Sequence, residues 1–519
     1  MLIFFNLLVL CEGGGTPMKK ILKVAAVFAI AALVSSQAFA KKANGSAEAG
    51  NTEATENGEA PAKAKKEKKS KKQIEAELAE NLKNAFAEGD YDTCLSIIKS
   101  KKDKKANALL NELDTDMLLH LKGDFLGSGK ALLATQGSMQ QSKKDTAGGK
   151  KAGAAMSSET ATKYTGNIYE RILMYTMRAV NALSMGDIGN AKGVMDTYTG
   201  DYKDLIAPLI AEQKALAEES EPSAEEEAEL NSSRDKLSSI GLSVDVAAMN
   251  SKKPPKSTKL YETSPFLSYL GTVIYAANGD AGHANDFASA LKKDNPSIDV
   301  SEDVAVPAGK GRIDVVALSG TIGKRSEKAN EFAAGAVGSI PIKFKIAYPA
   351  FEPQKQSHAV TAVRVTLNDG TAKTTTVIED FDEAVKIDVD LKARSAYNRS
   401  VFRNIMKTSI VIPTLAASLE AVQGMLSGGD NPLAQILYNK TAEGIRKAAD
   451  GLIEAERADL RQCSYFPHKA SVAGFTVAPG TYSAKVDYLS GNTVVATKNL
   501  ENIVVEAGKP TVVVSSCAK

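Results

Sequence analysis

The sequence has few of the residues that most often mark a catalytic or metal site. In 519 residues it has no tryptophan, four cysteines and four histidines. The histidines lie in different parts of the chain, and neither an H-x-x-x-H nor a C-x-x-C pair occurs. A G-x-S-x-G nucleophile motif is also absent. These absences argue against metalloenzymes and serine hydrolases, so we predict a non-enzymatic protein without a metal ion or other cofactor.

Two stretches have only a partial likeness to a phosphate-binding loop. In "GSGKALL" (127–133) the first glycine of that motif is replaced by Asp124 and the final Ser/Thr by Ala131. "PAGKGR" (307–312) precedes an expected strand, whereas a phosphate loop opens a helix. The sequence therefore predicts no nucleotide site.

Charge and hydropathy exclude two further classes. The formal net charge is only +2, so the chain as a whole has no electrostatic attraction to nucleic acid. Beyond residue 40 no apolar run approaches the roughly 18 residues that a spanning helix needs. The nearest, residues 409–419, is short and contains Pro413.

The first 40 residues have the features of an export signal. Met18 is followed by two lysines, a mostly apolar stretch (21–34) and Ala38-Phe39-Ala40, an A-x-A cleavage sequence. We predict that synthesis starts at Met18 and that cleavage follows Ala40. The exported chain would be periplasmic or associated with the outer membrane, and not transmembrane. The alternative is a lipoprotein in which Cys11 is acylated.

Residues 41–72 contain no large apolar side chain and predict a disordered, basic linker. Its lysine-rich end, residues 63–72, is interpreted as a solvated tether; attraction to an anionic envelope polymer or lipid is the alternative.

Residues 73–300 predict helical repeats. Four times an amphipathic helix is followed by Gly-Asp and a second amphipathic helix. Glycine tolerates the left-handed backbone that ends a helix, and aspartate caps the next one. The first two glycines lie 34 positions apart, the tetratricopeptide period. The turn residues are Gly89-Asp90, Gly123-Asp124, Gly186-Asp187 and Gly279-Asp280.

Three segments then carry a resemblance to a known family. They are "YERIL" with the following Gly186-Asp187 turn, "FKIAYPAFEP" (344–353) and "ADLRQCSYFPHKASVAGFTVAPGTYSAKV" (458–486). Together they resemble uncharacterised bacterial envelope proteins with a tetratricopeptide-like N-terminal half and a β-rich C-terminal half. The resemblance implies a scaffold in envelope assembly. Cys463 stands where that family usually has an aromatic residue, and its lipoprotein cysteine is missing from the exported end.

The C-terminal half is expected to mix strands and helices, giving a multidomain α+β protein. Residues 301–381 read as β-rich, 382–460 as helical, and 461–519 as a small β-sandwich-like domain. Cys463 and Cys517 bracket that last domain and are the plausible disulfide pair, while Cys94 is expected to be buried in a helix.

The leading functional hypothesis is a scaffold that binds an envelope protein partner through its helical repeats. Stacked helical repeats form concave surfaces, and a groove lined by Tyr164, Tyr169 and Tyr175 is the functional alternative to simple core packing of these rings. The second hypothesis is binding of cell-wall glycan or other polysaccharide by the C-terminal β domain.

Overall fold

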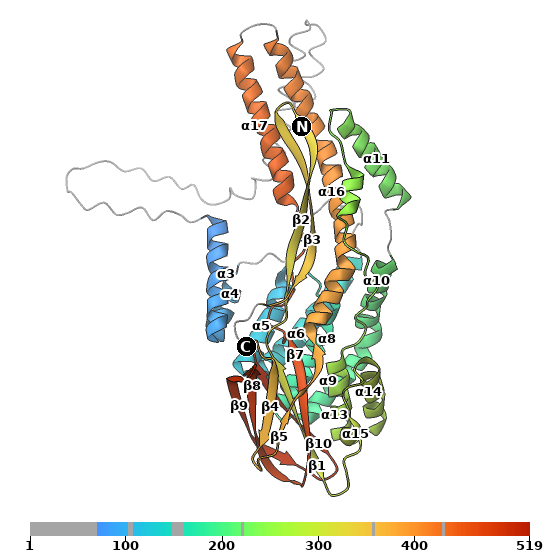
Figure 1. Cartoon of the computed structure of the whole chain (residues 1–519), viewed down its shortest axis with the longest axis vertical. Helices are drawn as coiled ribbons and strands as arrows, with labels where there is room; N and C mark the ends of the chain where they lie inside the picture. Colours follow the sequence, from blue (N-terminus) through green and yellow to red (C-terminus); the bar gives the residue numbers. More distant parts are fainter. Residues whose placement is uncertain are drawn as a thin grey trace, which may run out of the picture.

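The computed structural model describes residues 70–101, 107–147, 160, 162–218, 223–354, 359–427 and 431–519. The predicted leader and signal peptide (1–40) and nearly all of the predicted linker (41–72) lie outside these residues. The protein is elongated, with helices and a β-sandwich at one end of its long axis and a hairpin of two long helices at the other (Figure 1).

Helices account for the first half of the described chain, which gives the mixed α+β layout expected from the sequence. They are α3 (Lys71–Glu88), α4 (Tyr91–Ser100), α5 (Ala108–Lys122), α6 (Phe125–Ala147), α8 (Ile168–Ser184), α9 (Ile188–Asp201), the π-helical turn η3 (Tyr202–Ile206), α10 (Ala207–Glu218), α11 (Ala224–Ser238), α12 (Val246–Ser251), α13 (Pro265–Ala277), α14 (Ala281–Asp294) and α15 (Ser301–Val304).

The four predicted Gly-Asp turns have the expected geometry. Each glycine is left-handed, with φ between 73° and 90°. Each aspartate amide donates to the carbonyl five residues earlier, at 2.9–3.0 Å, and each carboxylate accepts from the backbone N–H three residues later. The small side chains five residues after each glycine, Cys94, Ser128, Ala191 and Ala284, are fully buried. These turns therefore join closely packed helix pairs; that the pairs are tetratricopeptide repeats stays a prediction.

In the part of the chain that the structure describes, ten strands form two four-stranded sheets and one long hairpin. The strands are β1 (Gly311–Ser319), β2 (Lys324–Val337), β3 (Ile340–Glu352), β4 (Ala362–Leu367), β5 (Ala372–Thr374), β6 (Thr376–Asp380), β7 (Lys469–Val477), β8 (Gly480–Ser490), β9 (Thr493–Val505) and β10 (Pro510–Cys517). The sheet orders are β10-β1-β7-β6 and β5-β4-β8-β9, and β2 pairs with β3.

The β-sandwich differs from the expected division of the chain at residue 461. β1 pairs in parallel with β10 and antiparallel with β7, and β4 pairs with β8. Each sheet thus combines strands from 311–380 with strands from 469–517, so 461–519 is not a sandwich by itself. The reason is that one face of each sheet must be covered: Ile313, Val315 and Ala317 of β1 pack against β4 and β8 side chains in one core cluster.

The other face of β1 carries helices. Val316 and Leu318 alternate along β1 with Val315 and Ala317, and they belong to the core cluster of α5, α8 and α13. All nine residues of β1 are buried, as expected for a strand that is covered on both faces. The order of layers is therefore helices, sheet, sheet.

The opposite end of the molecule is a stalk made by α16 (Phe381–Leu426), α17 (Pro432–Ala455), the β2–β3 hairpin and α11, which share a separate core. Although Pro413 lies within it, α16 is one continuous helix. Proline removes only its own amide donor, and packing of Ile405, Ile412 and Leu419 into the stalk core holds both halves in line. β2 lies within the segment expected to be β-rich, although "KRSEKANEFAAGAV" has little β-branched character.

Within the described residues α16 is also the one helix with the length and composition to cross a membrane, with 44% of its most apolar window buried inside the protein. The sequence reading had rejected this segment because of its length and its proline. The continuous helix overturns the length argument.

Candidate functional site

The three tyrosines for which a groove was the alternative to core packing are core residues. Tyr164, Tyr169 and Tyr175 are 5%, 0% and 1% exposed. The Tyr175 hydroxyl donates to Asp201 at 2.7 Å, and the Tyr164 hydroxyl donates to Glu170. The alternative of a tyrosine groove is therefore excluded, because α8 packs against α6, α9, α13, α16 and β10.

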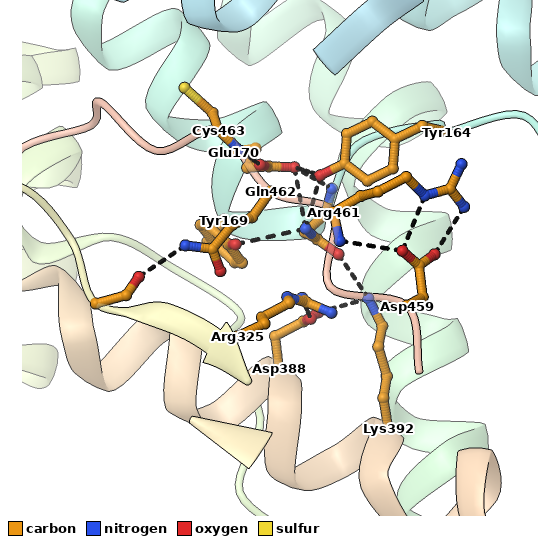
Figure 2. A network of polar contacts seen from close by, with 12 residues as sticks. Tyr164, Tyr169, Glu170, Arg325, Asp388, Lys392, Asp459, Arg461, Gln462 and Cys463 are labelled. Atoms are coloured by element: carbon orange, nitrogen blue, oxygen red, sulfur yellow. Dashed lines mark hydrogen bonds and ion pairs between the residues drawn. The ribbon is translucent and has the colours of Figure 1, made fainter. Parts of the chain in front are cut away.

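Tyr164 and Tyr169 belong to a buried polar network where the helical body meets the stalk (Figure 2). Glu170, in the first turn of α8, is its centre and is fully buried. Besides Tyr164, its carboxylate accepts from the backbone N–H of Asn167 at 2.7 Å and of Cys463 at 2.6 Å. Burial raises the pKa of Glu170, and these donors oppose the rise. Glu170 thus ties the start of α8 to the segment before β7.

A second part of the network joins β2 to α16. Arg325 is ion-paired with Asp388, and Lys392 lies 2.9 Å from the other oxygen of the same carboxylate. Burial alone would raise the pKa of Asp388, but Lys392 and Arg325 hold it below its usual range. Lys392 also donates to the side chain of Asn167 at 3.0 Å, which links this part to Glu170.

The segment 458–463 lies across both parts. Arg461 holds Asp459 through two hydrogen bonds of 2.8 and 2.7 Å, and its guanidinium lies 5.3 Å from the centre of the Tyr164 ring. Gln462 donates to the carbonyl of Gly323 at 2.7 Å. Two of the segments that carry the resemblance, "YERIL" and the segment that begins with "ADLRQC", are in contact through Glu170 and Cys463, which are 293 positions apart. The charged side chains of the network are ion-paired with one another. This arrangement suits a structural role, in which the network holds the two parts together, better than chemistry on a substrate.

The expected disulfide is not formed. Cys94, Cys463 and Cys517 are free thiols, and all are buried. Cys463 lies in the helical core and Cys517 in the core of the sandwich, so the two side chains pack into different clusters. Burial and the neighbouring Asp114 carboxylate raise the pKa of the Cys463 thiol well above its ordinary value. The burial of Cys94, by contrast, was expected.

One cluster in the described residues has donors that suit a metal ion: Asp380, Asp382 and His468, whose ligand atoms lie within 4.8 Å of one another. However, the Lys469 ammonium already lies 3.5 Å from Asp380. Asp382 accepts from the amide of Gly323, and Asp380 caps α16. The carboxylates are thus already neutralised or hydrogen-bonded, and we interpret the cluster as a set of ion pairs that fixes the start of α16.

Between α3 and the edge of the β-sandwich lies an open groove of about 2240 Å³. On one side α3 contributes an apolar stripe with four-residue spacing: Ile74, Leu78, Leu82 and Phe86. Ile74 is 46% exposed, so this stripe is only partly covered. Tyr465, whose ring lies 4.9 Å from that of Phe86, forms part of the floor.

The other side of the groove is the edge strand β9. The consecutive residues 495–498 all line it. Successive side chains of a strand point to opposite faces, so the groove reaches the edge of β9 and not just one face. Among the described strands β9 pairs only with β8. The α3 stripe could be read from the sequence, but its placement opposite β9 could not.

Comparisons with known proteins give no relative: no family model, no curated protein and no solved structure matches this chain.

Proposed function

We propose that this protein is a non-enzymatic scaffold of the bacterial envelope, and that it binds an extended segment of a protein partner in the groove between α3 and β9. The observation that carries the proposal is that a partly exposed apolar helix stripe faces the edge of β9, which among the described strands pairs only with β8. The signal-peptide pattern of residues 18–40 supports an envelope location.

The chemistry of the groove favours an extended segment. A strand added beside β9 would pair with its unused N–H and C=O groups, which supplies affinity without regard to sequence. Alternate side chains of that strand would face Leu78, Leu82 and Phe86 of α3, which supplies a preference for apolar residues. An exposed strand edge is otherwise a liability that proteins cover or block.

Two changes on α3 test this proposal. Ile74→Asp with Leu78→Asp places two carboxylates in the groove at positions that are partly exposed, so the fold should survive. The matched control is Ala76→Asp with Asn81→Asp, which adds the same charge to exposed positions of α3 that do not line the groove.

The exported protein and both variants would be used to capture partners from envelope extracts, with identification by mass spectrometry. We expect one stoichiometric protein that is retained by the control and lost with the groove variant. A peptide from that partner should bind the purified protein with the same pattern. Equal capture by both variants would contradict the groove, and co-sedimentation with purified cell wall but with no protein would favour the glycan hypothesis instead.

A further inference from the structure

Two buried carboxyl groups meet between the helical body and the β-sandwich. Asp314 belongs to β1 and Asp303 to the short helix α15, and both elements lie at the sandwich end of the molecule (Figure 1). Their side chains are 0% and 1% exposed, and the two carboxyl groups lie within hydrogen-bonding reach of each other. Two ionised carboxylates so close together in the interior would repel one another strongly.

The positive charge at this place is the guanidinium of Arg312. Arg312 precedes Asp314 by two positions and lies on the same face of β1. Its Nε donates to Asp303 at 2.6 Å and lies 3.2 Å from Asp314. Its Nη1 pairs at 2.6 Å with Glu302, whose side chain is 54% exposed. One guanidinium therefore faces two buried carboxyl groups, and one negative charge is uncompensated if both are ionised.

Three polar atoms of this cluster have no hydrogen-bond partner among the described residues. They are Asp303 Oδ2, Asp314 Oδ2 and the hydroxyl of Tyr269, which comes from α13 and is 1% exposed. The Tyr269 phenol is close enough to interact electrostatically with both carboxyl groups. Buried polar atoms without a partner are costly and rare. A proton held by one carboxyl group makes it a donor to the other and also removes the excess charge.

The neighbouring strands add no charge to the cluster. The residues beside Asp314 on β7 and β10 are Gly474 and Val512. A Cβ at Gly474 would overlap the Arg312 guanidinium and the Asp314 carboxyl group, so glycine at this position makes room for both. The titratable and charged groups that face Asp314 in the described structure are therefore Asp303 and Glu302 of α15, Arg312 of β1 and Tyr269 of α13.

We propose that Asp303 and Asp314 share one proton at neutral pH, and that this proton makes the packing of α15 on β1 a pH-sensitive contact. With the proton in place, one carboxyl group donates to the other, and Arg312 balances the one remaining negative charge. A metal ion is disfavoured at the same place, because the Arg312 guanidinium already lies against both carboxyl groups. Loss of the proton leaves two like charges, which push α15 away from β1.

The pKa of the pair gives the direction of the pH dependence. Burial and the neighbouring Asp303 carboxyl group raise the pKa of Asp314 well above its ordinary value of 3.8, although Arg312 opposes the rise. The folded state thus keeps a proton that the unfolded state releases. The stability that this proton contributes is fully present below about pH 4 and is lost as the pH rises through the raised pKa of the pair.

Isosteric variants of the exported protein test this proposal. Asp314→Asn and Asp303→Asn each replace a carboxyl group by an amide, which donates as the protonated acid does but does not titrate. The matched control is Asp286→Asn, which makes the same change at an exposed position of the neighbouring α14. Urea unfolding would be measured for each protein at several pH values between about 5 and 8.

Each single variant should remove the same dependence on one proton. Where the folded wild-type protein holds the extra proton, the unfolding equilibrium constant of either variant should fall relative to wild type by up to about tenfold per pH unit. The double variant should remove no further dependence, because the pair holds one proton. It should be less stable than either single variant, because Arg312 loses its buried counter-charge. The control should run parallel to wild type.

Hydrogen exchange reports on the contact itself. The backbone N–H groups of Val304 and Ala305 in and after α15 donate to the carbonyls of Val300 and Ser301. After correction for the intrinsic effect of pH on exchange, these amides should open more often in the wild-type protein as the pH rises. In Asp314→Asn their opening should not change with pH.

Four results would overturn the proposal. Equal pH dependence in the wild-type protein and both single variants would mean that no proton is shared. A dependence that only one of the two variants removes would assign the proton to a single residue. A loss of stability on addition of EDTA would mean that the carboxyl groups hold a metal ion instead. Exchange in α15 that does not change with pH in the wild-type protein would mean that the proton does not control the contact.

Discussion

The sharpest test of the buried network is the removal of the Glu170 carboxylate. In Glu170→Ala the hydroxyl of Tyr164 and the backbone N–H groups of Asn167 and Cys463 lose their acceptor. Each unsatisfied buried donor costs about 1–3 kcal/mol. Relief from burying the carboxylate offsets part of this, so we expect a loss of about 4 kcal/mol in the free energy of unfolding.

The chain offers a matched control in Glu226. Glu170 and Glu226 are both third-position glutamates of capping boxes, paired with Asn167 and Ser223. Glu226 is exposed and reaches back only to the backbone N–H of Ser223. Glu226→Ala should therefore cost only about 0.5 kcal/mol, and the difference between the two variants isolates the contribution of burial.

Hydrogen exchange measured by mass spectrometry gives the local readout. The peptide that covers residues 458–466 contains the Cys463 amide, which donates directly to Glu170. A loss of about 4 kcal/mol corresponds to roughly a thousandfold faster opening. Urea unfolding gives the global stability. If Glu170→Ala and Glu226→Ala behave alike in both measurements, the network does not hold the helical body to the stalk.

Three further predictions concern single residues. Burial raises the pKa of Asp116 from 3.8 to about 7. Between these two pH values the folded state keeps the proton of Asp116 while the unfolded state releases it. The stability that the protonated carboxyl group contributes is therefore fully present below about pH 4 and is lost as the pH rises through 7. Between about pH 4 and 7 the free energy of unfolding of Asp116→Asn should therefore rise relative to that of the wild-type protein by up to about 1.4 kcal/mol per pH unit. If the two free energies change in parallel with pH, the raised pKa of Asp116 is refuted. Gly186→Ala should destabilise the protein by about 1–2 kcal/mol, because φ at Gly186 is +73°. Gly193→Ala should stabilise it by about 0.5–1 kcal/mol, because Gly193 lies inside α9 and an added Cβ would meet open space. Melting temperatures of the two variants that shift in the same direction would contradict this contrast. Finally, the thiols of Cys94, Cys463 and Cys517 should resist a thiol reagent in the native protein and react with it after unfolding. A reductant should leave the melting temperature unchanged. A melting temperature that shifts with reductant would instead support the disulfide between Cys463 and Cys517.

Local chemistry explains what could be predicted of the fold. A left-handed glycine and a capping aspartate act within six residues of chain, so the four turns and the small side chains after them followed from the sequence alone. The same holds for the β-rich reading of residues 301–381, which contain strands β1 to β6. The candidate site was harder, because only the α3 stripe is a local pattern.

Non-local contacts decided the rest. The sequence determined the four Gly-Asp turns, the order of helical and β-rich segments and the burial of Cys94. Only the tertiary structure decided that β10 pairs with β1, that α16 continues through Pro413, and that α3 faces β9. It also buried Tyr164 and placed Glu170 beside the segment 458–463. The physical reason is that propensity and capping depend on neighbours in the chain, whereas the pairing of strands and the burial of side chains depend on which apolar faces must cover one another.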